Sequence, residues 1–273
     1  MPSAYAHYRF GTQMLEALPG DISRPIQRFR HMYDLGLYGP DIFYYTGPVL
    51  KSDAGFMGIK FHEQTGREFF VRVCRMLRQE RPEAGIAYLH GVLCHYCLDS
   101  MLHPFVMEQA ALGNATHMEI ETEFDRFLLQ TDGKTSADLT GFLPRSKLTP
   151  GEYDAIANFY PPASGRNVKK ALHNTVYWLR LLATPEGTKR KLLETGMKLT
   201  DKSLQGMFMT TQPNDKCAEL NEQLLALYEK AQAQMPILLH QLQEHMTHGE
   251  PFEEAFAPSF GGECPTPAEE SEA

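Results

Sequence analysis

The sequence predicts an all-α fold built as a single multi-helix domain. Apolar residues recur at helical spacing along most of the 273-residue chain, and no segment has the alternation of apolar and polar residues that is typical of a strand. Clusters of Pro and Gly separate the periodic segments, as expected for helices joined by turns. The hydrophobic content of 42% and the charged content of 22% are those of a globular domain with a large core.

Eight helices are expected in chain order. Pro82 suits the first turn of the third helix, and Pro104 is expected to stop that helix directly after His103. The last helix carries a stripe of leucines, which favours packing into the core over pairing with a second subunit. The expected helices lie near residues 22–35, 58–79, 83–103, 116–130, 151–160, 166–183, 187–199 and 216–247.

Two segments outside these helices have distinct compositions. Residues 37–48 are aromatic and are bracketed by Gly-Pro pairs, so they predict a rigid turn that presents the carboxylate of Asp41. Residues 248–273 are Pro-rich and acidic, which predicts a disordered tail without chemistry. The folded domain is therefore expected to span residues 1–247.

Charge, cysteine content and the N-terminus indicate a cytoplasmic protein. The formal net charge of −8 opposes indiscriminate binding to nucleic acid or anionic lipid. Five cysteines favour reduced thiols, and the Cys94-x-x-Cys97 pair lies within a helix, where burial is favoured over a redox role. The chain has no run of about 18 apolar residues that could span a membrane. Its start lacks the pattern of a secretory signal, which indicates an intracellular protein or one whose leader has been removed.

The strongest chemical signal is a series of His and carboxylate residues at intervals of four. His95, Asp99 and His103 share a face of one apolar helix, because four residues rotate a helix by about 400°. His117 and Glu121 repeat this step on the following helix. Imidazole and carboxylate groups together suit zinc. A cation is also the simplest compensation for a carboxylate such as Asp99 among leucines.

Other titratable residues do not fit this pattern. Glu119 is an alternative to Glu121 as the carboxylate ligand next to His117, but the i, i+4 spacing from His117 favours Glu121. Glu123 and Asp125 are expected to form a solvated face. The alternative for Asp125 is that it contacts a metal-binding residue and orients it. Core or solvated positions are favoured for the remaining histidines, which are His31, His90, His173, His240, His245 and His248.

These motifs resemble those of the zinc-dependent phospholipase C family, which shares its all-helical fold with single-strand-specific zinc nucleases. The family holds three zinc ions with an N-terminal residue, an early His, an Asp in an aromatic turn, a His on the next helix, a His-x-x-x-Asp followed by His, and a His-x-x-x-Glu or Asp. The resemblance covers residues 2–130 by motif and the later helices only by their helical character. It implies a metal site that lies between the helices.

The resemblance implies a first zinc ion bound by Asp41, His62 and His95. Asp99 would bridge this ion to another, which His7 and the amino group of the chain would also bind. Removal of the initiator Met would make Pro2 the terminal residue and thus the donor of that amino group.

The resemblance also implies a zinc ion between His103, His117 and Glu121. Secreted relatives begin with Trp, whereas this chain offers Met1 or Pro2. Two or three zinc ions are therefore expected.

A zinc centre of this kind implies a phosphodiester hydrolase in which a metal-bound water attacks phosphorus. Asp41 would act as a ligand or as the catalytic base that orients this water. The resemblance makes a phospholipid the first choice of phosphate-ester substrate, whereas a soluble phosphodiester, or a lipid reached from the cytosolic side, fits the expected location better. Phe43, Tyr44 and Tyr45 beside Asp41 would either contact the substrate through cation–π or stacking interactions or pack in the core, and the sequence favours neither.

Two other functions are compatible with the sequence. A non-catalytic helical module would keep one structural zinc or none and would act through binding partners. A single-strand nuclease would use the same ligands, although the net charge of −8 disfavours a nucleic-acid partner. Metal content and substrate preference distinguish these functions.

Overall fold

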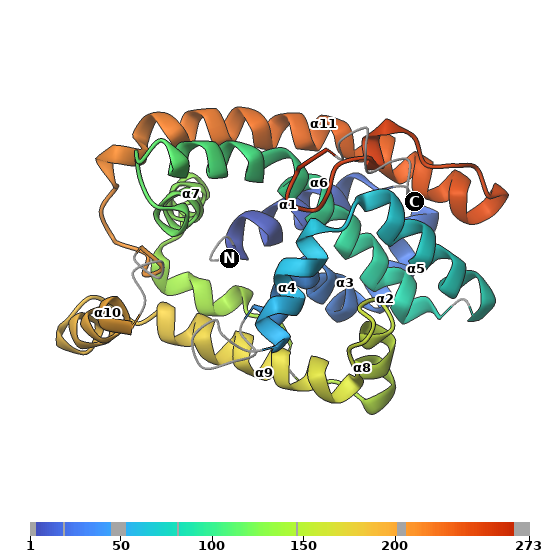
Figure 1. The fold of residues 1–273 in the computed structure, drawn as a ribbon, viewed down its shortest axis with the longest axis horizontal. Helices are drawn as coiled ribbons and strands as arrows, with labels where there is room; N and C mark the ends of the chain where they lie inside the picture. Colours follow the sequence, from blue (N-terminus) through green and yellow to red (C-terminus); the bar gives the residue numbers. More distant parts are fainter. Residues whose placement is uncertain are drawn as a thin grey trace.

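The computed structural model describes residues 4–18, 20–44, 53–80, 82–145, 147–200 and 206–264, and within these ranges helices are the only repeated secondary structure (Figure 1). One isolated bridge pairs Thr65 with Ser259. The predicted all-α fold is thus confirmed. The elements are α1 (Ala4–Ala17), α2 (Gly20–Arg28), α3 (Arg30–Gly36), the 3₁₀ helix η1 (Gly39–Phe43), α4 (Asp53–Glu63), α5 (Gly66–Glu80), α6 (Glu83–Ala111), α7 (His117–Thr131), η3 (Ser136–Phe142), α8 (Pro150–Ala157), α9 (Gly165–Leu182), α10 (Thr188–Thr200), η5 (Asp215–Cys217), α11 (Ala218–His248) and η6 (Glu254–Phe256).

Helix α6 forms the centre of the domain. Every residue from Ala87 to Asp99 is buried, and a helix that is buried all round must be surrounded by other elements. Helices α1, α3, α7 and α11 pack against it. In Figure 1, α11 runs across the top of the molecule and α9 along the opposite edge. Side chains on α6 therefore reach the interior of the domain.

Helices α3 and α6 approach so closely that both carry glycine at the crossing. A Cβ atom on Gly91 would overlap the carbonyl oxygen of Tyr33 and would lie 2.8 Å from Cα of Gly36. A Cβ atom on Gly36 would overlap the carbonyl oxygen of Tyr88. These neighbours are backbone atoms, so a larger residue can be accommodated only if the two helices separate.

Gly91→Ala is expected to lower the free energy of unfolding by about 3 kcal/mol, because it overpacks this crossing. Urea unfolding of the two proteins measures the change. Gly151→Ala is the matched control, since Gly151 lies in α8 with open space around it, and this change is expected to be neutral or slightly stabilising. Equal stability of the two variants would contradict the close packing of α3 and α6.

Several predicted helix boundaries are wrong. The helix expected near 22–35 is divided into α2 and α3 at Phe29, and the one expected near 58–79 is divided into α4 and α5 at Gln64 and Thr65. The apolar periodicity continues across both breaks, so the pattern alone does not reveal them. Helix α1 was absent from the expected set.

The expected helix stop at Pro104 is also wrong, because α6 continues to Ala111. Proline has no N–H to donate to the carbonyl of Ser100. Gly262 packs against this point with a φ of 80°, and a Cβ atom there would lie 2.6 Å from the carbonyl oxygen of Ser100. The C-terminal segment thus covers the place where the helix lacks a hydrogen bond, and His103 lies in mid-helix.

The expected disordered tail is ordered and packed over residues 249–264. Phe252, Phe256 and Phe260 expose 5%, 0% and 1% of their surface, and their rings contact Phe70 of α5. Three aromatic residues at intervals of four supply apolar area that the acidic, Pro-rich composition conceals. The domain therefore extends past the predicted boundary at 247, and residues 265–273 lie outside the described part.

The burial that the sequence favours for Cys94 and Cys97 is observed. Cys94 and Cys97 are buried free thiols, as are Cys74 and Cys217. Burial raises the pKa of Cys94 to about 12, so its thiol stays protonated at neutral pH. In the part of the chain that the structure describes, no helix is long and apolar enough to cross a membrane.

Candidate metal centre

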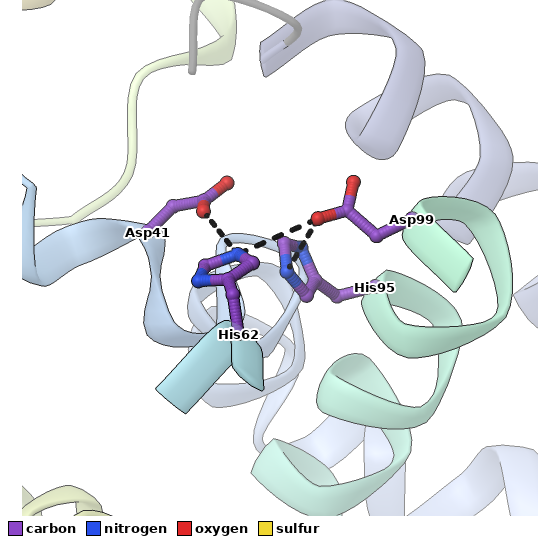
Figure 2. Close-up of side chains that lie close together, drawn as sticks. All are labelled: Asp41, His62, His95 and Asp99. Carbon is purple, nitrogen blue, oxygen red and sulfur yellow. Dashed lines mark ion pairs between the residues drawn. The ribbon is translucent and has the colours of Figure 1, made fainter. Parts of the chain in front are cut away.

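Four side chains from three elements converge inside the domain (Figure 2). Asp41 lies in η1, His62 lies in the last turn of α4, and His95 and Asp99 lie one turn apart on α6. All four residues are buried, and one nitrogen or oxygen atom of each lies within 4.8 Å of the others. These residues form the inner cluster.

Nitrogen and oxygen atoms of the inner cluster are close together without forming hydrogen bonds. Nε2 of His62 lies 3.0 Å from Oδ1 of Asp41 and 3.5 Å from Oδ2 of Asp99. Nε2 of His95 lies 3.5 Å from the same oxygen of Asp99. These four atoms are buried and have no hydrogen-bond partner. Buried nitrogen and oxygen atoms that lie this close together without hydrogen bonds are typical of metal ligands.

Backbone carbonyl groups orient both imidazoles of the inner cluster. Nδ1 of His62 donates to the carbonyl of Gly58 at 2.7 Å, and Nδ1 of His95 donates to that of Leu37 at 3.2 Å. With the proton on Nδ1, Nε2 keeps its lone pair for a metal. Gly39 permits the close approach of η1, since its φ is 47° and a Cβ atom would lie 2.5 Å from Cδ2 of His95. Sequence reasoning missed Leu37 and Gly58, whose contributions are backbone atoms without a side-chain signature.

A second group, the outer cluster, lies between α6 and α7. Nε2 of His117 lies 3.2 Å from Oε1 of Glu121, and the rings of His103 and His117 are 5.0 Å apart. One ligand atom of each residue lies within 4.8 Å of the others. Glu121 is buried whereas the two histidines are partly exposed. The outer cluster is therefore the part of the centre that is more accessible to solvent.

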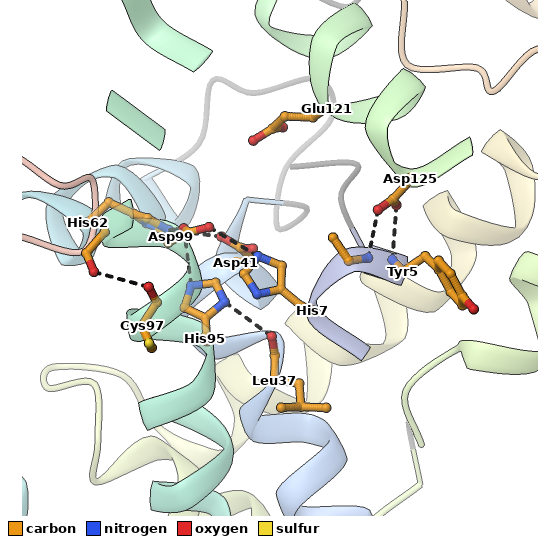
Figure 3. A network of polar contacts seen from close by, with 12 residues as sticks. Tyr5, His7, Leu37, Asp41, His62, His95, Cys97, Asp99, Glu121 and Asp125 are labelled. Carbon is orange, nitrogen blue, oxygen red and sulfur yellow. Dashed lines mark hydrogen bonds and ion pairs between the residues drawn. The ribbon is translucent and has the colours of Figure 1, made fainter. Parts of the chain in front are cut away.

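His7 of α1 extends the centre on the other side of Asp99 (Figure 3). Its Nε2 lies 3.1 Å from Oδ1 of Asp99, and its ring stacks on that of His95 with centroids 4.5 Å apart. Asp99 thus uses one oxygen toward His7 and the other toward His62 and His95. This is the position that a bridging carboxylate requires.

A cavity of about 20 Å³ lies among ligands of both clusters, which is room for about one water-sized group. His7, Asp99, His103 and Glu121 form its polar wall. The remainder of the wall is apolar and consists of Ala6, Leu98, Leu102, Val106, Phe124 and Leu224. An apolar wall strengthens electrostatic interactions at the polar side.

The donor set fits zinc. Five imidazoles and three carboxylates provide the nitrogen and oxygen atoms that zinc accepts. Nδ1 of His7 and Oε2 of Glu121 are also buried without a hydrogen-bond partner, and a cation would satisfy such atoms. The eight residues are His7, Asp41, His62, His95, Asp99, His103, His117 and Glu121.

Burial and mutual charge act against each other at these residues. Burial lowers the pKa of His62, but Asp41 and Asp99 outweigh it and raise this pKa to about 10. For His95 burial dominates, and its pKa falls to about 4. Burial works to raise the pKa of Asp99, yet the surrounding histidines hold it well below its usual range. Asp99 therefore remains ionised inside the domain.

The aromatic residues beside Asp41 have different surroundings. Phe43 is fully buried against Phe61 and Tyr160, which is the core position that the sequence left open as one of its two alternatives. Tyr44 is half-buried, and its hydroxyl lies 3.2 Å from Nδ1 of His62. The predicted residues Pro2 and Tyr45 lie outside the described residues.

The remaining acidic residues of α7 have structural contacts. Glu119 forms a capping box with Thr116, as expected for a residue outside the ligand set. The predicted solvated face at Glu123 and Asp125 is wrong, since these residues expose 4% and 0% of their surface. Glu123 forms an ion pair with Arg126 at 2.7 Å, and Asp125 accepts two hydrogen bonds from the backbone of α1.

The histidines set aside in the sequence lie outside both clusters. His31 pairs with Glu152 at 2.6 Å. His90 and His245 use Nδ1 to donate to backbone carbonyl groups. The i, i+4 spacing selected His95, His103 and His117 from among the histidines, whereas His7 and His62 were selected only through the family resemblance.

The fold and the site define an all-helical protein with a candidate metal centre of imidazole and carboxylate ligands. The family model for zinc-dependent phospholipase C matches residues 6–174, which is more than half of the chain, and the protein belongs to this family. The matched region includes all eight candidate ligands. No curated protein and no solved structure gave a significant match.

Proposed function

We propose that the protein is a zinc-dependent hydrolase of the phospholipase C type that cleaves a phosphodiester bond in a phospholipid. The observation that carries the proposal is the convergence of five imidazoles and three carboxylates, many of whose buried polar atoms lack a hydrogen-bond partner. Membership of the zinc-dependent family supports the choice of metal.

The inner cluster would hold one zinc ion through Asp41, His62 and His95. Asp99 would bridge this ion to a second one at His7, because its two oxygens face the two positions.

The outer cluster would hold a further ion through His103, His117 and Glu121. The three carboxylates of the centre carry three negative charges, so two or three Zn²⁺ ions leave a net positive charge. Such a centre attracts a phosphate ester even though the protein as a whole is acidic.

Zinc at these ligands would supply Lewis acidity, which polarises a phosphoryl oxygen and makes the attacking water more acidic. Asp41 would orient this water and accept its proton. The water oxygen forms a bond to phosphorus while the bond from phosphorus to the glycerol oxygen breaks. The glycerol oxygen takes up a proton, which yields diacylglycerol and a phosphomonoester.

An apolar cluster beside the centre supports a lipid substrate. Leu182, Met207 and Phe208 form its buried part. Tyr44, which contacts His62, and Met118, which follows His117, pack against it. The partly buried members, Tyr44 and Met118 among them, would offer apolar surface near the candidate ligands, which suits acyl chains better than a polynucleotide.

The test is hydrolysis by untagged protein whose N-terminal residue and zinc content have been determined. Phosphatidylcholine in mixed micelles is supplied with zinc, and release of diacylglycerol and phosphocholine is measured. Single-stranded DNA is assayed in parallel. We expect two or three zinc ions per chain and faster cleavage of the lipid.

Each alternative has its own outcome. Faster cleavage of single-stranded DNA would identify a nuclease. Zero or one zinc ion, with no cleavage of either substrate, would identify a non-catalytic module. Bound zinc with no hydrolysis of any phosphodiester would reject the proposed activity and leave the metal centre intact.

A further inference from the structure

Asp125 of α7 is a fully buried carboxylate that contacts the start of another helix (Figure 3). Its Oδ2 accepts a hydrogen bond from the backbone N–H of Tyr5 at 3.0 Å, and its Oδ1 accepts one from the N–H of Ala6 at 2.8 Å. Both N–H groups belong to the first turn of α1, where helical N–H groups have no acceptor within their own helix. Asp125 therefore caps α1 from a position about 120 residues away in the chain.

The same carboxylate is in register with the metal ligands of its own helix. His117, Glu121 and Asp125 follow one another at intervals of four, so they share a face of α7. The residue after Ala6 is His7, whose Nε2 lies 3.1 Å from Asp99. Asp125 thus connects the helix that carries the outer cluster with the helix that carries His7.

Stability alone is a weak explanation for a buried carboxylate at this position. The described structure has no ion pair to Asp125, and a buried carboxylate without a cationic partner is costly. Glu123 provides the contrast, because this buried acid of the same helix is neutralised by Arg126 at 2.7 Å. The partners of Asp125 are two backbone N–H groups and the positive end of the α1 dipole.

We propose that Asp125 is a positioning residue for the metal ion that His7 binds. By fixing the first turn of α1 against α7, it sets the distance between His7 and Asp99, and it has no such role for the ion of the inner cluster. This inference rests on the proposed zinc centre, in particular on an ion at His7.

The experiment compares Asp125→Asn with Glu123→Gln in untagged protein. Asparagine has one acceptor oxygen, and its NH₂ group would face one of the two backbone N–H groups, so the cap is disrupted. Zinc per chain is measured after dialysis at a fixed free zinc concentration, and helix content is measured by circular dichroism. We expect Asp125→Asn to bind one zinc ion fewer, with affinity for that ion reduced about 10- to 100-fold, and Glu123→Gln to keep the full number.

His7→Ala tests whether the effect passes through His7. This variant is expected to lose the same ion, and the double variant with Asp125→Asn should lose no further zinc. Excess zinc should restore the missing ion in Asp125→Asn but not in His7→Ala. Amide hydrogen exchange at Tyr5 and Ala6 should accelerate in Asp125→Asn and stay unchanged in Glu123→Gln.

Three results would overturn the inference. The first is an Asp125→Asn variant that keeps the zinc number and zinc affinity of the wild type. The second is a double variant that loses more zinc than His7→Ala alone. The third is a His7→Ala variant that binds as much zinc as the wild type. These readouts do not use hydrolysis. A protein that binds zinc as expected but cleaves no phosphodiester would reject the proposed activity without affecting this inference.

Discussion

Asp99→Asn is expected to lower hydrolysis of the phosphodiester substrate by at least about 10³-fold, which corresponds to about 4 kcal/mol of transition-state stabilisation. Among the residues that the structure describes, Asp99 is the single one whose two oxygens face two sets of imidazoles, at 3.1 Å from His7 and at 3.5 Å from both His62 and His95. Asparagine keeps one neutral acceptor and replaces the other oxygen with an NH₂ donor. The variant therefore loses both the charge and the second ligand atom.

Zinc content distinguishes loss of the centre from loss of the fold. Asp99→Asn should bind at least one zinc ion fewer than the wild type while its helix content stays the same. Asp34→Asn is the control, because this carboxylate pairs with Arg30 at 2.6 Å outside the centre, and it should keep full activity and full zinc content. Wild-type hydrolysis by Asp99→Asn would refute the assignment of Asp99 as a bridging ligand.

The sequence predicted which side chains lie close together better than it predicted the helix boundaries. His95 and Asp99 are one turn apart, and the i, i+4 rule depends only on local geometry that every α-helix shares. The relation of these residues to Asp41 and His62 involves three elements, and only the resemblance to a family suggested it. Helix periodicity and the family resemblance agree because the face of α6 that carries His95 and Asp99 lies toward η1 and α4.

The errors arise where distant segments determine local structure. Pro104 predicts a helix stop, but Gly262 packs against the interrupted turn. Asp125 was expected on a solvated face, with support of a metal ligand as the alternative, whereas its hydrogen-bond partners are backbone groups of α1. Backbone contacts of this kind leave no pattern in the sequence.

Removal of zinc by a chelator is expected to lower the melting temperature by at least about 8 °C at pH 8. Each ion held at about 1,000 times its dissociation constant stabilises the folded state by about 4 kcal/mol, and about 1 kcal/mol corresponds to about 2 °C for a chain of this size. Thermal unfolding followed by circular dichroism, with and without chelator, measures the shift. Asp99→Asn, which is expected to bind at least one zinc ion fewer, should show a smaller shift.

The chelated protein should remain folded because protonated His62 neutralises part of the negative charge of Asp41 and Asp99 that zinc would otherwise neutralise. Asp41 and Asp99 raise the pKa of His62 to about 10, so without metal this imidazole is protonated between the two carboxylates. A raised folded-state pKa stabilises the protein fully below the unfolded value of about 6.5, and this contribution is lost as the pH rises toward 10. Zinc binding has the opposite dependence, since protons compete for its ligands at low pH.

The difference in melting temperature between zinc-loaded and chelated protein should therefore grow from pH 6 to pH 8. The zinc-loaded protein gains affinity for its ions over this range, and the chelated protein gradually loses the contribution of protonated His62. A difference that is independent of pH would contradict both effects, the competition of protons with zinc for the imidazoles and the loss of the His62 contribution. Equal melting temperatures with and without chelator would show that these buried atoms do not bind a metal ion that stabilises the fold.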